Sequence, residues 1–426
     1  MSGYWERPIP VQNPPLPPFL GTDFKSVPMG QGGFPLYPDA CGQCHKDQYN
    51  GWKDSLHSKA VGPGLLGQLP GTDLKSVPKD PEFALSCYFC HAPMEEQAEV
   101  KKQTPDTRHQ TPDRNNNYTK NLFFDNRLKL SGVSCSVCHL RKGKVYGPPK
   151  RQGVRGQGSG VRDYKSEIRP RSGGAKSEIE AHDGFIEKDF FGKAEFCAAC
   201  HQLDEGYELN GKPLTNTYRE WKESFYSKNN IHCQSCHMPD RRHLFRGIHD
   251  PDMVKKGIAI DVSREGNKAR LAITNTGVGH FFPTYTTPMV VIKGFLVDMK
   301  GKIIPGSLKE AFIGRKVSLD LTQEFFDTRV PPQKGFEFDY NPPIPPLWGQ
   351  ISNLSAVPTA QAGLSPMGKG GFSNKLVFEV WVYPDEFYNR FYKSLLKGNE
   401  GFNRKAIEKA LKITEGSGYR LFRRVL

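Results

Sequence analysis

The 426-residue chain has few apolar side chains for a protein of its length. Hydrophobic residues make up only 37%, whereas glycine (43) and proline (34) are abundant. Such a polar, turn-rich chain cannot build a large core from its side chains alone. We therefore expect bulky bound groups to fill part of the interior, and the length favours more than one domain.

The sequence also lacks a long apolar run and a recognisable export signal. A helix that spans a membrane needs about 18 or more consecutive apolar residues. No such run occurs, so we predict no integral membrane segment. The stretch from Met1 to Leu20 is rich in proline and has no basic start, apolar segment and small-residue cleavage site in succession.

No cysteine is left over for a disulfide. All ten cysteines fall in five Cys-x-x-Cys pairs, each followed directly by histidine. No Cys-x-x-Cys-Lys variant is present. The five motifs are Cys41-Gly-Gln-Cys44-His45, Cys87-Tyr-Phe-Cys90-His91, Cys135-Ser-Val-Cys138-His139, Cys197-Ala-Ala-Cys200-His201 and Cys233-Gln-Ser-Cys236-His237.

The motifs predict five covalently attached haem c groups. Two thiols three positions apart reach the two vinyl groups of one porphyrin as thioethers, and the next residue supplies the proximal imidazole to the iron. Zinc sites would pair the motifs into four-ligand sets. Five motifs cannot pair in this way, and zinc would leave the constant histidine unexplained.

The charge balance fits the same interpretation. The formal net charge is +14, but lysine and arginine are dispersed and form no one-sided stripe, so we predict no nucleic-acid binding. Two propionates on each of five haems would add about ten carboxylates and leave a much smaller excess.

The spacing of the motifs indicates how the haems are used. Successive motifs begin 46, 48, 62 and 36 residues apart. Segments this short cannot each enclose one porphyrin in a separate core, so the haems must share walls. Because electron tunnelling decays exponentially with distance, closely packed haems conduct, and we expect an electron-transfer protein.

The sixth ligand of each iron comes from the remaining histidines. The five candidates are His57, His182, His243, His249 and His280. His109 lies in a polar insert and His232 directly precedes Cys233, so both are left out. No methionine stands in an obvious ligand setting, and bis-histidine ligation favours low reduction potentials. Which histidine serves which haem, and whether one iron is five-coordinate, stays open.

The order of elements predicts an α+β protein in three parts. Residues 1–252 carry every motif on short helices and loops, residues 253–384 read as an antiparallel β-sandwich-like domain, and residues 385–426 as a helical extension. The expected strands are Ile258–Val262, Ala269–Asn275, Val290–Met299, Ala311–Leu319, Phe336–Tyr340 and Leu376–Tyr383. Low-complexity stretches, including the repeated Gly21–Pro28 and Gly71–Pro78, are interpreted as solvated inserts.

A short internal repeat indicates a duplicated haem-holding unit. Trp52-Lys-Asp-Ser-Leu-His57-Ser-Lys matches Trp221-Lys-Glu-Ser-Phe-Tyr226-Ser-Lys, and each copy follows a haem motif. His57 becomes Tyr226 in the second copy, so a ligand was gained or lost at this position.

Several segments resemble bacterial multihaem c cytochromes related to the tetrahaem carrier that serves hydroxylamine oxidoreductase. These include CGQCHKDQYNGWKDSLHSKA from Cys41, CYFCHAPMEEQ from Cys87, CQSCHMPDRRHLFRGIHD from Cys233, and GVGHFFPT around His280. The resemblance implies mainly bis-histidine haems and a periplasmic or extracellular location, where haem attachment to such motifs takes place. It names neither substrates nor partners.

Three functions remain possible from the sequence. The first is electron transfer to and from redox partner proteins. The second is an oxidoreductase in which one open-site haem acts on a small nitrogen or sulfur compound. The third is self-association of subunits into a filament or haem relay.

Overall fold

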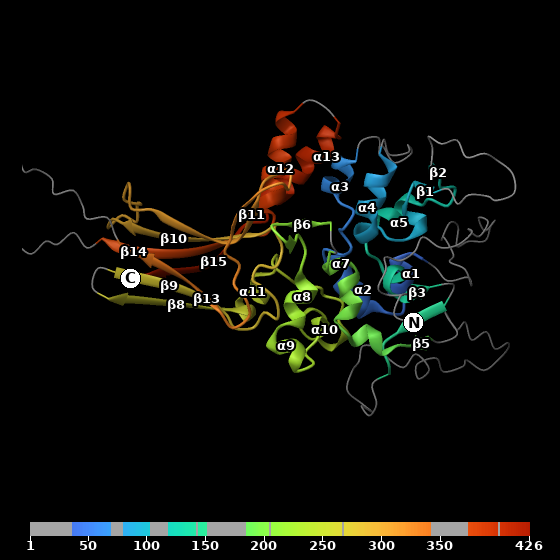
Figure 1. The fold of residues 1–426 in the computed structure, drawn as a ribbon, viewed down its shortest axis with the longest axis horizontal. Coiled ribbons are helices and arrows are strands. Elements are labelled where there is room, and N and C mark those ends of the chain that lie inside the picture. Colours follow the sequence, from blue (N-terminus) through green and yellow to red (C-terminus); the bar gives the residue numbers. More distant parts are fainter. Residues whose placement is uncertain are drawn as a thin grey trace, which may run out of the picture.

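The computed structural model describes residues 36–69, 80–102, 118–141, 144–150, 185–203, 206–265, 268–341, 374–398 and 401–426. The expected inserts at Gly21–Pro28 and Gly71–Pro78, together with His109 and His182, lie outside these ranges. The chain divides into a helical region that carries the cysteine motifs and a region of two β-sheets, shown at the right and left of Figure 1. This arrangement confirms the predicted α+β class. Within the described ranges, no helix has the length and apolarity that crossing a membrane requires.

The motif region consists of short helices joined by loops. Proline at the first turn starts several of them, and the Asp80 and Asp250 carboxylates cap two by accepting hydrogen bonds from backbone N–H groups. The helices are α1 (Pro38–Gly42), α2 (Lys46–Asp54), α3 (Pro63–Gln68), α4 (Pro81–His91), α5 (Asn126–Leu130), α6 (Cys135–His139), α7 (Glu195–His201), α8 (Thr217–Lys222), α9 (Phe225–Lys228), α10 (Cys233–His237) and α11 (Pro251–Gly257).

Short strand pairs connect these helices. They are β1 (Val100–Lys102) with β2 (Tyr118–Lys120), β3 (Leu140–Arg141) with β4 (Lys144–Gly147) and β5 (Ile186–Glu187), and β6 (Glu208–Leu209) with β7 (Lys212–Pro213). Single turns of 3₁₀ helix occur at Glu95–Gln97, Asp189–Gly192 and Pro239–Arg241.

Four of the five motifs end the helix that contains them, namely α4, α6, α7 and α10. In the first motif the chain turns between α1 and α2, where the His45 N–H donates to the Cys41 carbonyl at 2.9 Å. One helical turn brings residues i and i+3 to the same side, so both thiols can face one porphyrin.

The β region contains two antiparallel sheets. One has the order β13-β9-β8 and the other β12-β11-β10-β14-β15. Their bounds are β8 (Ile258–Glu265), β9 (Lys268–Asn275), β10 (Met289–Val297), β11 (Lys309–Val317), β12 (Glu324–Asp327), β13 (Gly335–Tyr340), β14 (Lys375–Tyr383) and β15 (Tyr419–Val425). All six predicted strands are present, and β12 and β15 were not predicted.

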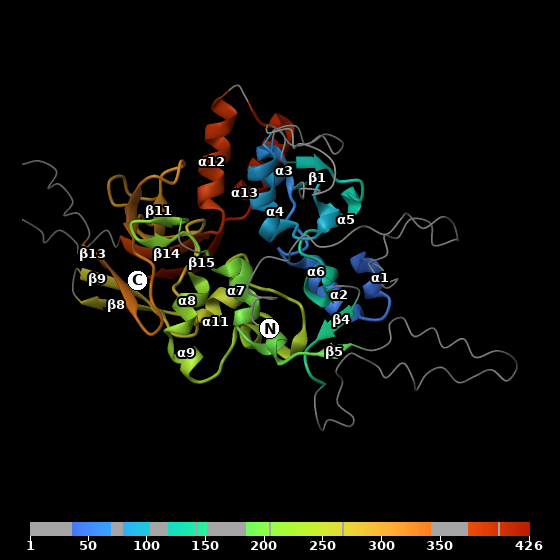
Figure 2. The same cartoon turned by 45° about the vertical axis from the view of Figure 1, so that its right-hand side comes forward.

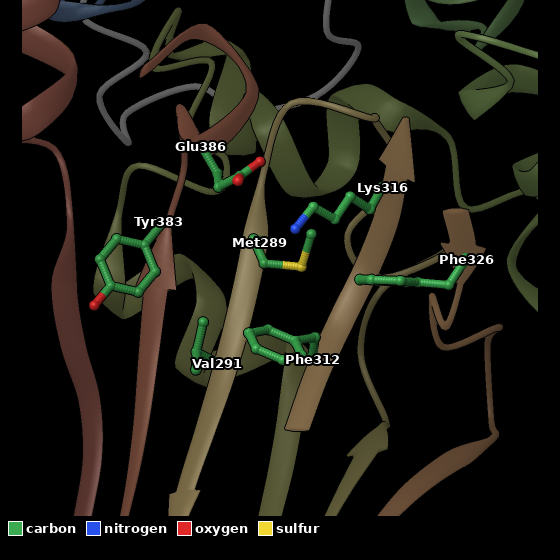
Figure 3. A pocket seen from close by; sticks show the side chains of 7 residues that line it. All are labelled: Met289, Val291, Phe312, Lys316, Phe326, Tyr383 and Glu386. Atoms are coloured by element: carbon green, nitrogen blue, oxygen red, sulfur yellow. The ribbon is translucent and has the colours of Figure 1, made fainter. Parts of the chain in front are cut away.

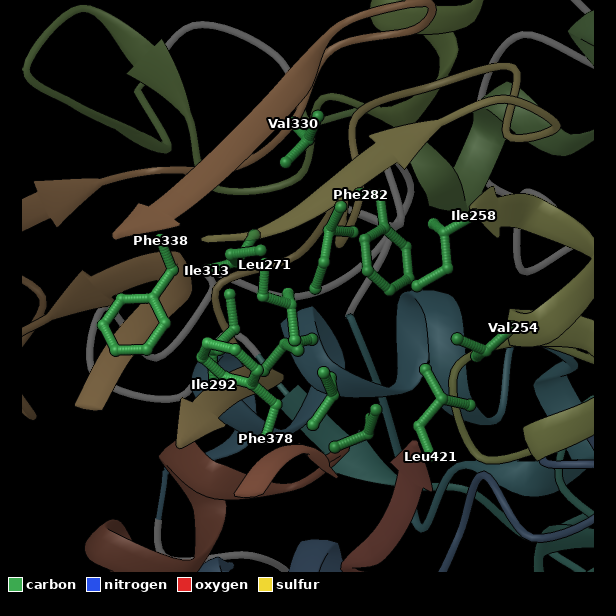
Figure 4. Close-up of a cluster of buried hydrophobic side chains, with 14 of the residues drawn as sticks. Val254, Ile258, Leu271, Phe282, Ile292, Ile313, Val330, Phe338, Phe378 and Leu421 are labelled. Atoms are coloured by element: carbon green, nitrogen blue, oxygen red, sulfur yellow. The ribbon is translucent and has the colours of Figure 1, made fainter. Parts of the chain in front are cut away.

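The two sheets share one apolar core (Figure 4). It combines Leu271 and Ile273 of β9 with Ile292 of β10 and Phe378 of β14, each fully buried. Alternation of apolar and polar residues along the strands directs these side chains inward. The predicted sandwich-like packing therefore has a physical basis in this cluster.

The C-terminal segment returns to the motif region before it ends in the sheet. Helices α12 (Glu386–Lys397) and α13 (Arg404–Glu415) form a hairpin, and α13 packs on α3 (Figure 2). Gly67 of α3 allows this approach, because a Cβ there would meet Ile407 at 2.5 Å. The expected helical extension thus includes two helices followed by strand β15.

Candidate haem-ligand sites

In four motif histidines, a contact of the ring nitrogen Nδ1 fixes the orientation of the imidazole. Nδ1 contacts the backbone carbonyl of Ala60 at 2.8 Å in His91, of Tyr146 at 2.8 Å in His139 and of Arg246 at 2.5 Å in His237. In His201 it contacts the hydroxyl of Tyr285 instead.

A carbonyl oxygen only accepts hydrogen bonds, so Nδ1 of the first three rings carries the proton. Nε2 then keeps its lone pair for a metal. This tautomer is the one that a proximal haem ligand requires.

Three motif histidines each face a second imidazole. The ring centroids are 6.2 Å apart for His57 and His201, 6.0 Å for His139 and His243, and 6.3 Å for His237 and His280. These pairs join residues that are distant in the sequence.

The separations fit two ligands on opposite sides of one metal. Imidazole nitrogen binds a first-row metal such as zinc at about 2.0–2.1 Å, and a five-membered ring has its centroid about 1.1–1.2 Å behind that nitrogen. Two opposed rings would then have centroids about 6.2–6.6 Å apart. The observed values of 6.0–6.3 Å lie near the lower end of this range, so these residues fit a haem iron.

Burial holds four of the six paired imidazoles neutral. Burial, with smaller effects from neighbouring histidines, lowers the pKa of His57 to about 3 and that of His201 to about 4. Burial likewise lowers the pKa of His243 and of His280 to about 4. Since only a neutral imidazole offers a lone pair, the environment favours the metal-binding form.

His249 differs from the other predicted ligands. Its Nε2 lies 3.1 Å from both carboxylate oxygens of Asp385, at the start of α12. Its Nδ1 is buried and has no hydrogen-bond partner among the described residues. The ring is therefore held by Asp385 with the other nitrogen left for a ligand role.

His232 shows a similar feature that sequence reasoning did not use. Its Nδ1 accepts a hydrogen bond from the Ala194 N–H at 3.2 Å, and within the described ranges no partner satisfies its buried Nε2. His232 is not among the ligands predicted from the sequence, because it lies directly beside Cys233.

Cysteines of different motifs lie near one another. In three pairs the thiols affect each other's pKa, namely Cys41 and Cys135, Cys90 and Cys200, and Cys197 and Cys233. The first motif therefore lies beside the third, and the fourth lies beside both the second and the fifth.

Aromatic side chains fill part of the space around the motifs. The Phe191 ring stacks on His139 at 5.1 Å and lies 4.8 Å from Phe196. Phe196 in turn contacts Phe190 edge-on at 5.6 Å.

The predicted internal repeat has the same hydrogen bonds in both copies. The indole N–H of Trp52 donates to the Val133 carbonyl at 2.7 Å, and that of Trp221 donates to the Ile231 carbonyl at 2.8 Å. Each acceptor stands two residues before a motif. The Val133 N–H donates to the carbonyl of His57, and the Ile231 N–H to the carbonyl of Tyr226, both at 2.9 Å.

His57 and Tyr226 thus occupy equivalent places with different targets. The His57 ring faces His201 of the following unit. The Tyr226 hydroxyl donates to the Thr276 carbonyl at 3.1 Å, and its ring lies against Gly279. The second copy of the repeat therefore contacts the β region, which contains no Cys-x-x-Cys-His motif.

A buried network of charges joins the two regions. Glu220 of α8 pairs with Arg329 at 2.9 Å, and Arg329 pairs with Asp327 at 2.8 Å. Lys212 bridges Asp327 and Glu324, and Glu324 pairs with Arg315 at 2.6 Å.

Glu220 also accepts the Phe281 N–H at 3.1 Å. Phe281 follows His280 directly, so the network holds the segment that carries this imidazole.

A shallow cavity of about 230 Å³ lies on the β region, away from the motifs (Figure 3). It opens beside the start of α12. Its lining residues are Met289, Val291, Phe312, Lys316, Phe326, Tyr383 and Glu386.

Comparisons with known proteins agree with this geometry. Residues 40–140 match the family described as cytochrome c554 and c-prime. The matched segment contains the first three Cys-x-x-Cys-His motifs.

The crystal structure of a penta-heme cytochrome c552 from Thermochromatium tepidum matches with a TM-score of 0.51 and 18% identity. The alignment covers 84% of this chain and 92% of that chain, so the two proteins share a fold. A search of curated proteins found no match.

Proposed function

We propose that this chain is a five-haem c-type cytochrome that transfers electrons. The ten motif cysteines would form the thioether bonds, and His45, His91, His139, His201 and His237 would be the proximal ligands. When bound, the haems supply reversible one-electron chemistry. The observation that carries the proposal is the set of three facing imidazole pairs with centroids 6.0–6.3 Å apart.

These pairs support three specific ligand assignments. His57 would complete the haem of the fourth motif, His243 that of the third and His280 that of the fifth. His249 or His182 would serve the first or second motif. Ligation by two neutral imidazoles favours low reduction potentials.

The cysteine contacts favour a branched path for electrons. The first motif would pass them to the third, and Cys138 of the third interacts electrostatically with Cys200 of the fourth. The fourth motif also touches the second and the fifth. It would therefore be the junction through which the other haems exchange electrons.

An oxidoreductase with one open haem is the second candidate. Asp385 occupies Nε2 of His249, and the buried Tyr388 interacts with both Asp385 and Cys87 of the second motif. If His249 does not bind the iron there, the second haem would have a free face beside an acid–histidine pair.

The wider setting is also a proposal. The motif chemistry and the resemblance to relatives of the hydroxylamine oxidoreductase carrier support a periplasmic or extracellular location with redox partner proteins. We also propose three parts with boundaries near residues 252 and 384, the last of which adds strand β15 to the larger sheet. Self-association into a longer relay would extend the same path.

Spectroscopy of the purified holoprotein tests the function. We expect five haem c groups per chain by pyridine haemochrome assay, and low-spin signals from the three paired haems. In His280→Ala one of these signals should become high-spin, while Tyr226→Phe, the control beside the same segment, should change none. Fewer than five haems, or unchanged spin states in His280→Ala, would refute the assignments.

Binding of carbon monoxide separates the two candidates. The electron carrier predicts no binding to the reduced wild-type protein. Binding to one haem that disappears in His91→Ala would support the open-site enzyme instead.

A further inference from the structure

The proximal histidine of the fourth motif differs from those of the second, third and fifth motifs. Backbone carbonyls hold Nδ1 of His91, His139 and His237. Nδ1 of His201 contacts a side chain, the Tyr285 hydroxyl, instead. A side-chain hydroxyl both accepts and donates hydrogen bonds and can therefore be linked to further groups, whereas a backbone carbonyl only accepts.

The Tyr285 hydroxyl begins a chain of side-chain hydrogen bonds. Thr217 of α8 lies beside it, close enough to affect the pKa of Tyr285. The Thr217 hydroxyl lies 3.0 Å from that of Thr284, and the Thr284 hydroxyl donates to a Glu220 carboxylate oxygen at 2.7 Å. Four contacts thus connect His201 to a buried carboxylate.

The carboxylate sets the direction of every bond. Ionised glutamate only accepts hydrogen bonds, so Thr284 donates to it and must accept from Thr217, because each hydroxyl has one hydrogen. Thr217 must then accept from Tyr285. The Tyr285 oxygen is left to accept the Nδ1–H of His201.

Three donors converge on the Glu220 carboxylate. Its side chain is 3% exposed and pairs with Arg329 at 2.9 Å, while the Phe281 N–H donates to it at 3.1 Å. Burial raises the Glu220 pKa, and the Arg329 charge and three hydrogen bonds oppose that effect.

Aligned hydrogen bonds that end on an anion polarise one another and strengthen the first donor. A stronger hydrogen bond at Nδ1 raises the basicity of the nitrogen that binds the metal. A more basic proximal ligand stabilises the oxidised iron and lowers its reduction potential.

We propose that Tyr285, Thr217, Thr284 and Glu220 form a relay that lowers the reduction potential of the haem held by His201. The inference rests on the proposed function. Since the fourth motif touches the second and fifth, its haem would be the junction of the path. A lowered potential there keeps electrons from resting at the junction and distributes them to the neighbouring haems.

Potentiometric titration of the holoprotein, followed by electron paramagnetic resonance, tests the relay. The haem in question is the one whose low-spin signal disappears in His57→Ala. In Tyr285→Phe its midpoint potential should rise while the other four stay unchanged. Thr217→Val, which keeps Tyr285 in place but breaks the link to Glu220, should raise the same potential by a smaller amount.

The control is Tyr340→Phe. It removes a buried tyrosine hydroxyl, which donates to the Ser307 carbonyl at 2.7 Å in the β region, and it should shift no potential. A potential unchanged in Tyr285→Phe or in Thr217→Val would overturn the relay, as would equal shifts of all five haems. If the Tyr285→Phe variant does not incorporate its haems, the midpoint potential measured in Thr217→Val alone tests the relay.

The haem count distinguishes a failure of the relay from a failure of the proposed function. A wild-type protein with fewer than five haems would refute the proposed function itself. Five haems with unshifted potentials in the variants would refute only the relay.

Discussion

The motif region and the β region are built on different principles. The β region buries seventeen hydrophobic residues in one cluster that both sheets share. Among the described residues, the largest cluster of the motif region contains six, although this region is formed from many more separate elements. The described helices therefore share only a small side-chain core, and bound porphyrins would supply further apolar contacts.

The difference also explains where the polar connections lie. A region with little apolar packing must be held to its neighbour in other ways, and the buried ion pairs from Glu220 to Arg315 provide these contacts. Breaking one member of such a network leaves a buried charge unpaired, which is costly.

The largest effect should follow removal of a haem from the motif region. In the Cys197→Ser, Cys200→Ser double variant, we expect loss of the fourth haem and collapse of the packing around it, because three other motifs adjoin that site. Haem content should fall from five to four or fewer, and proteolysis should cut the motif region while the β region stays resistant. The exposed Ser263→Ala variant is the control. Retention of protease resistance throughout the chain would show that the two regions do not differ in this way.

A core substitution in the β region should lower the stability of that region and leave the haem sites unchanged. Ile292 is fully buried between the sheets, so Ile292→Ala should lower the free energy of unfolding by about 2–5 kcal/mol. Chemical denaturation followed by fluorescence should reveal the loss, and the haem spectrum should not change. Val425→Ala, at a side chain that is 43% exposed, should cost much less. A changed haem spectrum in Ile292→Ala would mean that the β core supports the haem sites directly.

The smallest effect concerns the ion pairs between the two regions at low pH. Burial disfavours ionisation of Asp327, but hydrogen bonds and charges from Arg329 and Lys212 outweigh it and lower the pKa to about 2. A carboxyl whose pKa is lowered by folding stabilises the native state above its unfolded pKa of about 3.9. That contribution, about 2 kcal/mol, should be lost as the pH falls from about 4 to about 2.

Denaturation at pH 5 and pH 2.5 measures this contribution. The wild-type protein should lose more stability over the interval than Asp327→Asn, whose side chain cannot titrate. Equal losses in the two proteins would show that Asp327 makes no such contribution.

Much of the fold could be predicted from local pattern. Alternation of apolar residues predicted β9 and β14 to within a residue, and the spacing of Phe387, Phe391 and Leu395 predicted α12. Strand β15 was missed because its sequence, YRLFRRV, has three arginines among seven residues. Helix α2 ends at Asp54, where the Ser55 hydroxyl donates to the Trp52 carbonyl and a turn follows.

The candidate site was only partly predictable. The motifs define the attachment residues because all their atoms lie within five consecutive positions. The partners of His57 and Tyr285 depend on contacts between segments far apart in the chain, and no local pattern encodes these. The repeat around Trp52 and Trp221 was the one sequence signal for such a contact, and it indicated equivalent positions without their targets.

Iron positions in a crystal of the holoprotein, located by anomalous diffraction, test the central claim most directly. The account predicts five iron atoms, with one midway between His57 and His201, one between His139 and His243 and one between His237 and His280. Fewer than five irons, or imidazole pairs without iron between them, would contradict it.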